Sequence, residues 1–166
     1  MTDHPGGFRR IKLNHSEDFF IRKVLKETKL KEIMNAPPVF AYVEDQVHTV
    51  IKKMNDRRIR HIPVVSKAGE LLGVITQGDL FKYCPPHKNE DGVWYYDPAE
   101  VDNLILKHIM TPEPFALTPE DTIDKAVLAM AQHKYGCVPI VDEHKRLCGI
   151  ITQMDIILMA ASIVSE

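Results

Sequence analysis

The stretch LLGVITQGD at residues 71–79 returns as LCGIITQMD at residues 147–155. The two copies lie 76 positions apart, and residues 30–81 can be laid over residues 106–157 at this spacing without a gap. Roughly sixteen positions carry the same residue in both copies, more than chance gives over about fifty ungapped positions. The chain therefore contains two copies of one supersecondary unit.

Each copy contains two β-rich runs, the second of which begins the quoted stretch. In the first copy, the runs at residues 61–65 and 71–75 flank a Lys-Ala-Gly-Glu turn, which favours a β-hairpin. The second copy has its corresponding runs at residues 137–141 and 147–151. A helix is expected to begin at the threonine that follows each second run.

A shorter strand and a helix precede each hairpin. Apolar runs at residues 39–43 and 115–117 favour the strand. Apolar residues then recur at i, i+3, i+4 and i+7 from Val47 and from Ile123, a spacing that predicts an amphipathic helix. In the second copy, residues 118–121 read Thr-Pro-Glu-Asp, and we expect them to cap that helix.

A unit of this kind cannot cover both faces of its small sheet alone, whereas two units packed about a pseudo-twofold axis can share a core. The predicted fold class is therefore α+β, with two β-α-β-β-α repeats. The expected division of the chain is a tail and helix at residues 1–28, repeat 1 at 29–84, a connector at 85–104, repeat 2 at 105–161 and a tail at 162–166.

Two more helices are expected outside the repeats, and the helix that ends the second repeat has a composition of its own. Residues 16–28 carry an apolar stripe that includes Phe20, Ile21, Val24 and Leu25, which predicts a helix packed on the domain. Residues 97–100 read Asp-Pro-Ala-Glu and resemble a capping box for a helix that continues through Leu104 and Ile105. The last helix, at 154–164, is apolar almost all round, so we expect a homodimer to supply part of its cover.

The composition is that of an ordinary globular domain. The chain has 166 residues, with 21 Lys+Arg against 23 Asp+Glu and a formal net charge of −2. This balance gives no overall field that would gather nucleic acid or an anionic membrane. The three cysteines form no Cys-x-x-Cys pair, and no apolar run is long and uninterrupted enough for a signal or a membrane span. We therefore expect a cytoplasmic protein.

The sharpest chemical motif is Thr-x-x-Asp, at Thr76 and Asp79 and again at Thr152 and Asp155. One interpretation is a helix cap, in which Thr satisfies a backbone N–H and Asp favours the positive end of the helix dipole. The other is a ligand site, because N–H groups at a helix N-terminus suit phosphate and a carboxylate accepts hydrogen bonds from ribose hydroxyls. The two roles are compatible.

The repeat resembles a tandem pair of CBS domains, the module also called a Bateman module, over about residues 29–161. The resemblance is carried by Ile-Met at the start of each copy (residues 33–34 and 109–110), by the strands at residues 61–65 and 138–141, and by the two Thr-x-x-Asp stretches. It implies an α+β fold, disc-like dimers and sensing of adenosyl ligands rather than catalysis. Residues 35–37 read Asn-Ala-Pro where the family usually has Thr-Pro, which puts a backbone contact to the base in doubt there.

The resemblance also implies that the Thr and Asp of both motifs hold ribose and phosphate. Basic residues before the hairpin face phosphates in nucleotide-binding members, and arginine can grip phosphate through two hydrogen bonds. Those positions hold Arg60 and His61 in the first copy but Gly136 and Cys137 in the second. This asymmetry predicts that a phosphate-rich ligand lies mainly against Arg60 and His61. A solvated basic helix end, which includes Arg57 and Arg58, is the alternative.

Adenine needs an apolar slot, and the candidates are the residues next to Pro38 and Pro114, which occupy equivalent positions in the two copies. The predicted ligand-binding residues are therefore Thr76, Asp79, Thr152, Asp155, Arg60, His61, Pro38, Val39, Pro114, Phe115, Ile62 and Val138. Residues 94–96, Trp-Tyr-Tyr, could close over a base, but aromatic residues in a connector more often anchor it to the domain.

No local motif indicates an enzyme or a metal site. The eight histidines lack metal-ligand spacing, and the chain has no P-loop and no Gly-x-Ser-x-Gly elbow. The leading hypothesis is a stand-alone regulatory module without catalysis or an obligatory cofactor. It would bind AMP, ADP, ATP or S-adenosylmethionine between its repeats and signal through dimer shape or a regulated protein partner.

Two alternatives remain. The first is a ligand-independent interaction scaffold in which both Thr-x-x-Asp motifs only cap helices. The second is nucleic-acid binding through the basic clusters at residues 9–12 and 57–60, since some relatives bind adenine-rich strands. The acidic balance of the chain disfavours the second alternative.

Overall fold

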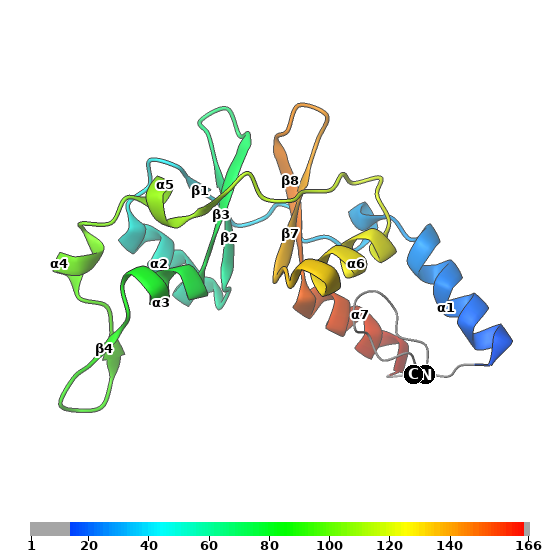
Figure 1. The fold of residues 1–166 in the computed structure, drawn as a ribbon, viewed down its shortest axis with the longest axis horizontal. Coiled ribbons are helices and arrows are strands. Elements are labelled where there is room, and N and C mark those ends of the chain that lie inside the picture. The colour runs from blue at the N-terminus through cyan, green and yellow to red at the C-terminus, as the bar shows by residue number, and fades with distance from the viewer. Residues whose placement is uncertain (1–13, 165–166) are drawn as a thin grey trace.

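The computed structural model describes residues 14–164 and has the predicted α+β fold with two repeats (Figure 1). The hairpins of the two repeats stand side by side in the middle of the molecule, and the helices of each repeat lie on the outer side of its hairpin (Figure 1). The first repeat contains β1 (Ala41–Tyr42), α2 (Val47–Arg57), β2 (His61–Val65), β3 (Leu71–Thr76) and α3 (Gln77–Tyr83). The second contains α6 (Ile123–His133), β7 (Cys137–Val141), β8 (Leu147–Thr152) and α7 (Gln153–Val164).

The remaining elements lead into the repeats or connect them. They are α1 (His15–Glu27), the 3-10 turn η1 (Leu30–Glu32), β4 (His87–Lys88), β5 (Trp94–Tyr95), α4 (Pro98–Val101), α5 (Leu106–Ile109) and β6 (Thr111–Pro112). Helix α4 is shorter than expected, because the chain turns after Val101 and a separate helix begins at Leu106.

The two hairpins have the same register, as the repeat predicts. His61 pairs with Thr76 in the first and Cys137 with Thr152 in the second, and each hairpin has an irregularity near its turn. The two turns also bond to each other, since Leu71 N donates to Lys145 O. The predicted first strand is reduced to the two residues of β1 in repeat 1 and to a single bridge at Leu117 in repeat 2.

The predicted amphipathic helices α2 and α6 are present, and each buries its apolar stripe. Both end at a residue in the left-handed conformation, Arg58 (φ 53°) and Lys134 (φ 59°). The expected cap of α6 at residues 118–121 is wrong, because α6 begins at Ile123. Residues 118–121 instead form a separate turn whose carbonyls accept hydrogen bonds from the N–H groups of η1, and this tertiary contact holds the turn outside the helix.

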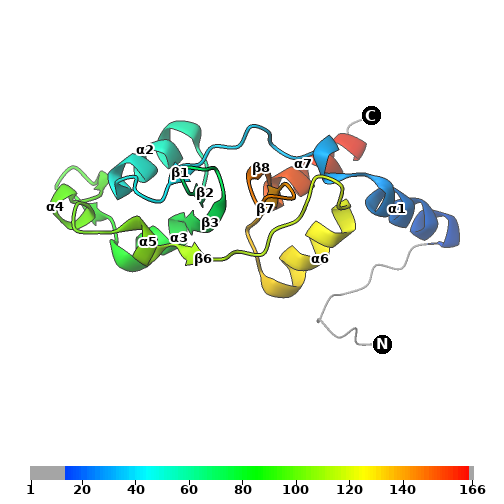
Figure 2. The same ribbon diagram turned by 90° about the horizontal axis from the view of Figure 1, so that it is seen from above.

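The leading segment of each repeat crosses to the other repeat. Strand β6, in the leading segment of repeat 2, is the edge of the first sheet, whose order is β1-β2-β3-β6. Reciprocally, Asn35 pairs with Ile150 of β8. Figure 2 shows the two crossing segments running between the halves along opposite edges of the molecule. The pseudo-twofold arrangement therefore rests on an exchange of segments as well as on contact between the hairpins.

Two glycines make this crossing possible. A Cβ on Gly73 would lie 2.5 Å from Met110 Sδ, and one on Gly149 would lie 2.5 Å from Met34 Sδ. Each methionine belongs to the leading segment of the other repeat. Both glycines are therefore needed for close packing.

We expect Gly149→Ala to lower the free energy of unfolding by about 1–3 kcal/mol, the usual cost of overpacking. Urea denaturation would measure this change. The matched control is Gly78→Ala, since the nearest atom to a Cβ there is Thr76 Oγ1 at 3.5 Å, an ordinary contact. Equal stability of the two variants would contradict the role given to the crossing segment.

The apolar surface is unevenly covered. In helix α1 no residue is buried; Leu25 packs against the second core, but Phe20 and Ile21 remain exposed. In α7, Met154, Ile157, Leu158 and Ile163 are all exposed. The expected cover of this last helix on several sides is therefore not supplied by the described residues of this chain itself.

Candidate functional site

A cleft of about 550 Å³ lies at the junction of the two repeats. One wall comes from repeat 1 and contains residues 35–39 and the end of α2 with the start of β2. The other wall comes from repeat 2 and contains Gly136, Ile150 and the start of α7. Six of the predicted residues line it: Pro38, Val39, Arg60, His61, Thr152 and Asp155.

The start of α7 forms a complete Thr-Asp hydrogen-bond set. The Thr152 N–H and hydroxyl both donate to Asp155 Oδ2 at 2.7 Å, and the Asp155 N–H donates to Thr152 Oγ1 at 3.4 Å. Thr76 and Asp79 make the same set at the start of α3. The capping interpretation is therefore observed in both copies, and in each it uses Oδ2 of the carboxylate.

Asp155 and Asp79 differ in the partner of the second carboxylate oxygen, Oδ1. Asp155 Oδ1 accepts a hydrogen bond from Asn35 Nδ2 at 2.8 Å. Asn35 stands where the second copy has Thr111, and no described residue forms the corresponding bond to Asp79. The carboxylate of Asp155 thus already holds one external N–H donor at the cleft surface, and a ribose hydroxyl would have to replace it.

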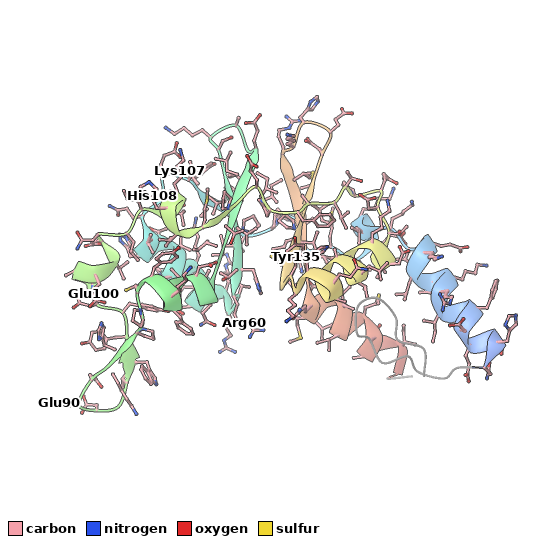
Figure 3. All side chains as sticks on the ribbon, in the orientation of Figure 1. Arg60, Glu90, Glu100, Lys107, His108 and Tyr135 are labelled. Atoms are coloured by element: carbon pink, nitrogen blue, oxygen red, sulfur yellow. The ribbon has the colours of Figure 1, made fainter. Side chains whose placement is uncertain are left out.

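The repeat 1 wall carries a concentrated positive charge. Arg57, Arg58 and Arg60 all line the cleft and are exposed. Within residues 14–164, none of them forms an ion pair. Figure 3 shows Arg60 at the lower end of the first hairpin and Tyr135 at the lower end of the second. Uncompensated guanidinium groups gathered in one cleft favour an anionic ligand.

His61 projects across the junction toward the second repeat. A Cβ on Gly136 would collide with the His61 ring, so the small residue that replaces Arg60 in the second copy makes room for this histidine. Burial lowers the pKa of His61 and the charge of Arg60 lowers it further, whereas Asp79 opposes the shift. The imidazole is therefore neutral at pH 7 and can donate one hydrogen bond and accept another.

The other predicted residues lie elsewhere. Thr76 and Asp79 belong to the equivalent junction of the first repeat, and Pro114 and Phe115 lie on the leading segment of the second. Phe115 stacks on Tyr135, with ring centroids 6.0 Å apart and planes at 19°. Tyr135 in turn stacks on a histidine, His133, at 5.2 Å.

Ile62 and Val138 require a correction. Both were expected to line the adenine slot, but neither has exposed surface, and each belongs to the hydrophobic core of its own repeat. They occupy the inward-facing positions of β2 and β7, because successive side chains of a strand point to opposite faces. The apolar wall of the cleft comes from Pro37, Pro38, Val39 and Ile150 instead.

The suggested lid at residues 94–96 is wrong. The β4–β5 hairpin projects from the end of repeat 1 that is remote from the repeat junction (Figure 1). Tyr96 packs against the first core, as the anchoring interpretation predicts, whereas Trp94 and Tyr95 remain exposed.

Two residues that line the cleft were not among the predicted site residues, although each carries a signal in the sequence. Asn35 departs from its counterpart Thr111, and Gly136 departs from Arg60, so both positions break the internal repeat. Each departure changes the cleft directly, through the bond to Asp155 and through the room for His61.

Residues 14–164 contain neither a metal-binding cluster nor a membrane-spanning helix. No three His, Cys, Asp or Glu side chains are grouped so that they could hold a metal ion. No helix in this part of the chain has the length and apolar character needed to span a membrane. The basic residues Arg9, Arg10 and Lys12, considered for nucleic-acid binding, lie outside the described residues.

Comparison with known proteins places this geometry in context. The family profile described as CBS domain matches residues 30–85 and 106–161. The uncharacterized protein YlbB of Bacillus subtilis is 30% identical over 132 residues, which cover 79% of this chain and 81% of YlbB. L-aspartate semialdehyde sulfurtransferase of Methanocaldococcus jannaschii is 26% identical over 129 residues, 78% of this chain but 22% of that protein. The chain thus spans about a fifth of this last relative.

Two solved structures resemble this one over most of their length. The CBS domain pair of protein MJ0100, in complex with 5′-methylthioadenosine and S-adenosyl-L-methionine, has a TM-score of 0.65 and 25% identity. The match covers 80% of this chain and 99% of that one. CBSX2 in complex with AMP has a TM-score of 0.66 and 18% identity, with 81% and 97% covered.

Proposed function

This chain belongs to the CBS domain family, and on that premise we propose that it is a regulatory module that binds an adenine nucleotide in the cleft between its two repeats. The observation that carries the proposal is that three arginines, none of which forms an ion pair within residues 14–164, line one cleft with the Thr152–Asp155 helix start. The complexes of the MJ0100 domain pair with adenosyl compounds support the choice of adenosine as the recognised group. The proposed role is non-catalytic and needs no obligatory cofactor.

The charge of the cleft favours the phosphorylated adenosyl compounds. S-adenosylmethionine carries a positive sulfonium group, which Arg57, Arg58 and Arg60 would repel. AMP, ADP and ATP carry phosphates that guanidinium groups bind through charge-assisted hydrogen bonds. We therefore rank the nucleotides above S-adenosylmethionine for this cleft.

Each wall has a proposed role. Asp155 accepts hydrogen bonds from the ribose hydroxyls, which replace the hydrogen bond from Asn35. The arginines bind the phosphates. The apolar surface of Pro38 and Val39 contacts the base, while neutral His61 adds a hydrogen-bonding group without further positive charge. Thr76, Asp79, Pro114 and Phe115 are proposed to serve a second adenosyl site at the equivalent junction.

The test is thermal unfolding with AMP, ADP, ATP, S-adenosylmethionine and GTP, each in excess. A ligand at 100 times its dissociation constant stabilises the folded state by about 2.7 kcal/mol. We expect this stabilisation for an adenine nucleotide. We expect Asp155→Asn to lower the affinity for that nucleotide at least tenfold and so to reduce the stabilisation. Asp79→Asn is the matched comparison, since it removes the same capping carboxylate from the second proposed site and should leave binding in the cleft unchanged. Calorimetry would separate one occupied site from two.

The competing scaffold function gives a different result. If no nucleotide stabilises the protein and both Asn variants are merely less stable to a similar extent, the motifs act only as helix caps. Tight binding of an adenine-rich oligonucleotide that weakens steeply with salt would instead favour the nucleic-acid alternative.

We further propose that the module forms a homodimer through α7, transmits ligand occupancy through the dimer or a protein partner, and works in the cytoplasm. Ligand binding can shift such an assembly only if it favours one arrangement over another. The free cysteines Cys84, Cys137 and Cys148 suit a reducing compartment.

We expect Leu158→Asp to convert the dimer to a monomer, because it places a charge on the exposed apolar face of α7. Light scattering after gel filtration would measure the mass. Val93→Asp is the control, since Val93 and Leu158 have the same exposed fraction, 59%. A dimer that survives Leu158→Asp would exclude α7 as the interface.

A further inference from the structure

A second and larger cavity, of about 1070 Å³, lies beside the connector. Its walls are helices α2 and α3 of repeat 1 on one side and residues 85–102 on the other. Most of that connector segment lies outside the residues matched by the family profile, which end at residue 85 and resume at residue 106. We call this cavity the connector pocket.

Aromatic side chains dominate the walls of the connector pocket. Phe81 faces it from α3, and Trp94, Tyr95 and Tyr96 face it from the connector. Phe81, Trp94 and Tyr95 are 48%, 65% and 47% exposed, so three large rings keep accessible surface around one concavity. Lys88 Nζ lies over the Trp94 ring, 5.7 Å from its centroid, and the His87 ring lies 5.9 Å from that of Tyr95. Rings arranged in this way favour stacking or edge contacts with another ring.

The electrostatics of the pocket are opposite to those of the arginine cleft. Its lining contains no lysine or arginine, and its one carboxylate is Asp102. His48 Nδ1 lies 3.5 Å from Asp102 Oδ1. The side chains of Asn55 and Gln77 also line the pocket, and no described residue hydrogen-bonds to them. The two amides can recognise hydrogen-bond donors and acceptors, and the carboxylate of Asp102 disfavours an anion.

We propose that the connector pocket binds an aromatic or heteroaromatic small molecule that is uncharged or carries an amino group. The rings supply stacking surface, and Asp102 supplies an acceptor for an ammonium or N–H donor. The pocket size is that of a site for a drug-sized ligand. This site is separate from the proposed nucleotide cleft, because the two have no lining residue in common.

The chain provides its own reporter for this site, since Trp94 is its single tryptophan. The probes are 2-phenylethylamine, 2-phenylethanol and phenylacetate, which share a ring and differ in charge. We expect the amine and the alcohol to change the Trp94 emission saturably and phenylacetate to bind at least tenfold more weakly than the amine. Asp102→Asn should reduce the affinity of the amine to that of the alcohol.

Two variants on helix α3 provide the matched comparison. Phe81→Ala should weaken the amine and the alcohol at least fivefold, whereas Tyr83→Ala, also an exposed ring but outside the pocket, should leave both unchanged. Asp155→Asn should leave them unchanged as well, so failure of nucleotide binding and failure of this site are distinguishable. Thermal unfolding of each variant would establish that it is folded.

Two outcomes would overturn the proposal. Equal affinity for the three probes, or no saturable change in emission, would exclude selective binding in the pocket. If the probes bind only to the monomer and dissociate a dimer, the occupant of the pocket is a second copy of the chain.

Discussion

Leu30→Ala is expected to destabilise the second repeat by about 2–5 kcal/mol, although Leu30 lies at the start of the first repeat in the sequence. The Leu30 side chain has no exposed surface and lies in the core that contains Ile123 and Ile140. Its N–H also donates to Asp121 O at 2.8 Å, so the turn η1 is fixed to repeat 2 by both packing and hydrogen bonding. Removal of the side chain leaves a cavity there.

Leu106→Ala is the mirror experiment. Leu106 is equivalent to Leu30 but lies in the core of the first repeat, together with Val50 and Ile62. We expect hydrogen exchange to accelerate in β7 and β8 for Leu30→Ala, and in β2 and β3 for Leu106→Ala. Lys31→Ala removes an exposed ion pair with Glu120 and should lower stability far less than either leucine variant, because solvent screens such pairs. Acceleration in the repeat that follows each leucine in sequence would refute the crossed packing.

The double substitution Arg57→Ala, Arg60→Ala is expected to weaken ATP binding at least a hundredfold, which corresponds to about 2.7 kcal/mol. Hydrogen bonds to charged groups contribute about 1.5–3 kcal/mol each, so the loss of two phosphate contacts is enough. Calorimetric titration would measure the affinity. This prediction rests on the proposed nucleotide site.

Adenosine provides the ligand control, since it has the same base and ribose but no phosphate. Its affinity should change less than threefold, and S-adenosylmethionine should bind no more weakly than before. Lys134→Ala is the protein control, because Lys134 occupies the position of Arg58 in the second copy, away from the cleft lining. An equal loss for ATP and adenosine would mean that the arginines support the wall rather than bind phosphate.

The free energy of unfolding distinguishes the arginine variants from Leu30→Ala. Arg57 and Arg60 are exposed and have no ion pair within the described residues, so their replacement should change the free energy of unfolding by no more than about 0.5 kcal/mol. Leu30→Ala, by contrast, acts through a buried side chain. The same urea titrations would therefore distinguish a binding defect from a folding defect.

The sequence by itself determined the elements whose cause is local. The β-rich runs and the turn between them predicted the first hairpin, the corresponding runs of the second copy predicted the other, and the 3.6-residue stripes predicted α2 and α6. The Thr-x-x-Asp spacing predicted the caps at Thr76 and Thr152, because the hydrogen bonds that make a cap join residues three positions apart. The internal repeat predicted that the two halves would share one architecture.

Only the tertiary structure decided which parts of the two copies meet. Periodicity shows that one face of an element is buried but not which neighbour buries it, so the exchange of the leading segments could not be read from the sequence. The same limit explains the turn at residues 118–121, which is held by η1, and Ile62 and Val138, which face the cores. It also explains why Arg60 lines the same cleft as Asp155 of the other repeat and why the connector encloses a pocket with α3. Long-range packing brings together residues that no local spacing relates.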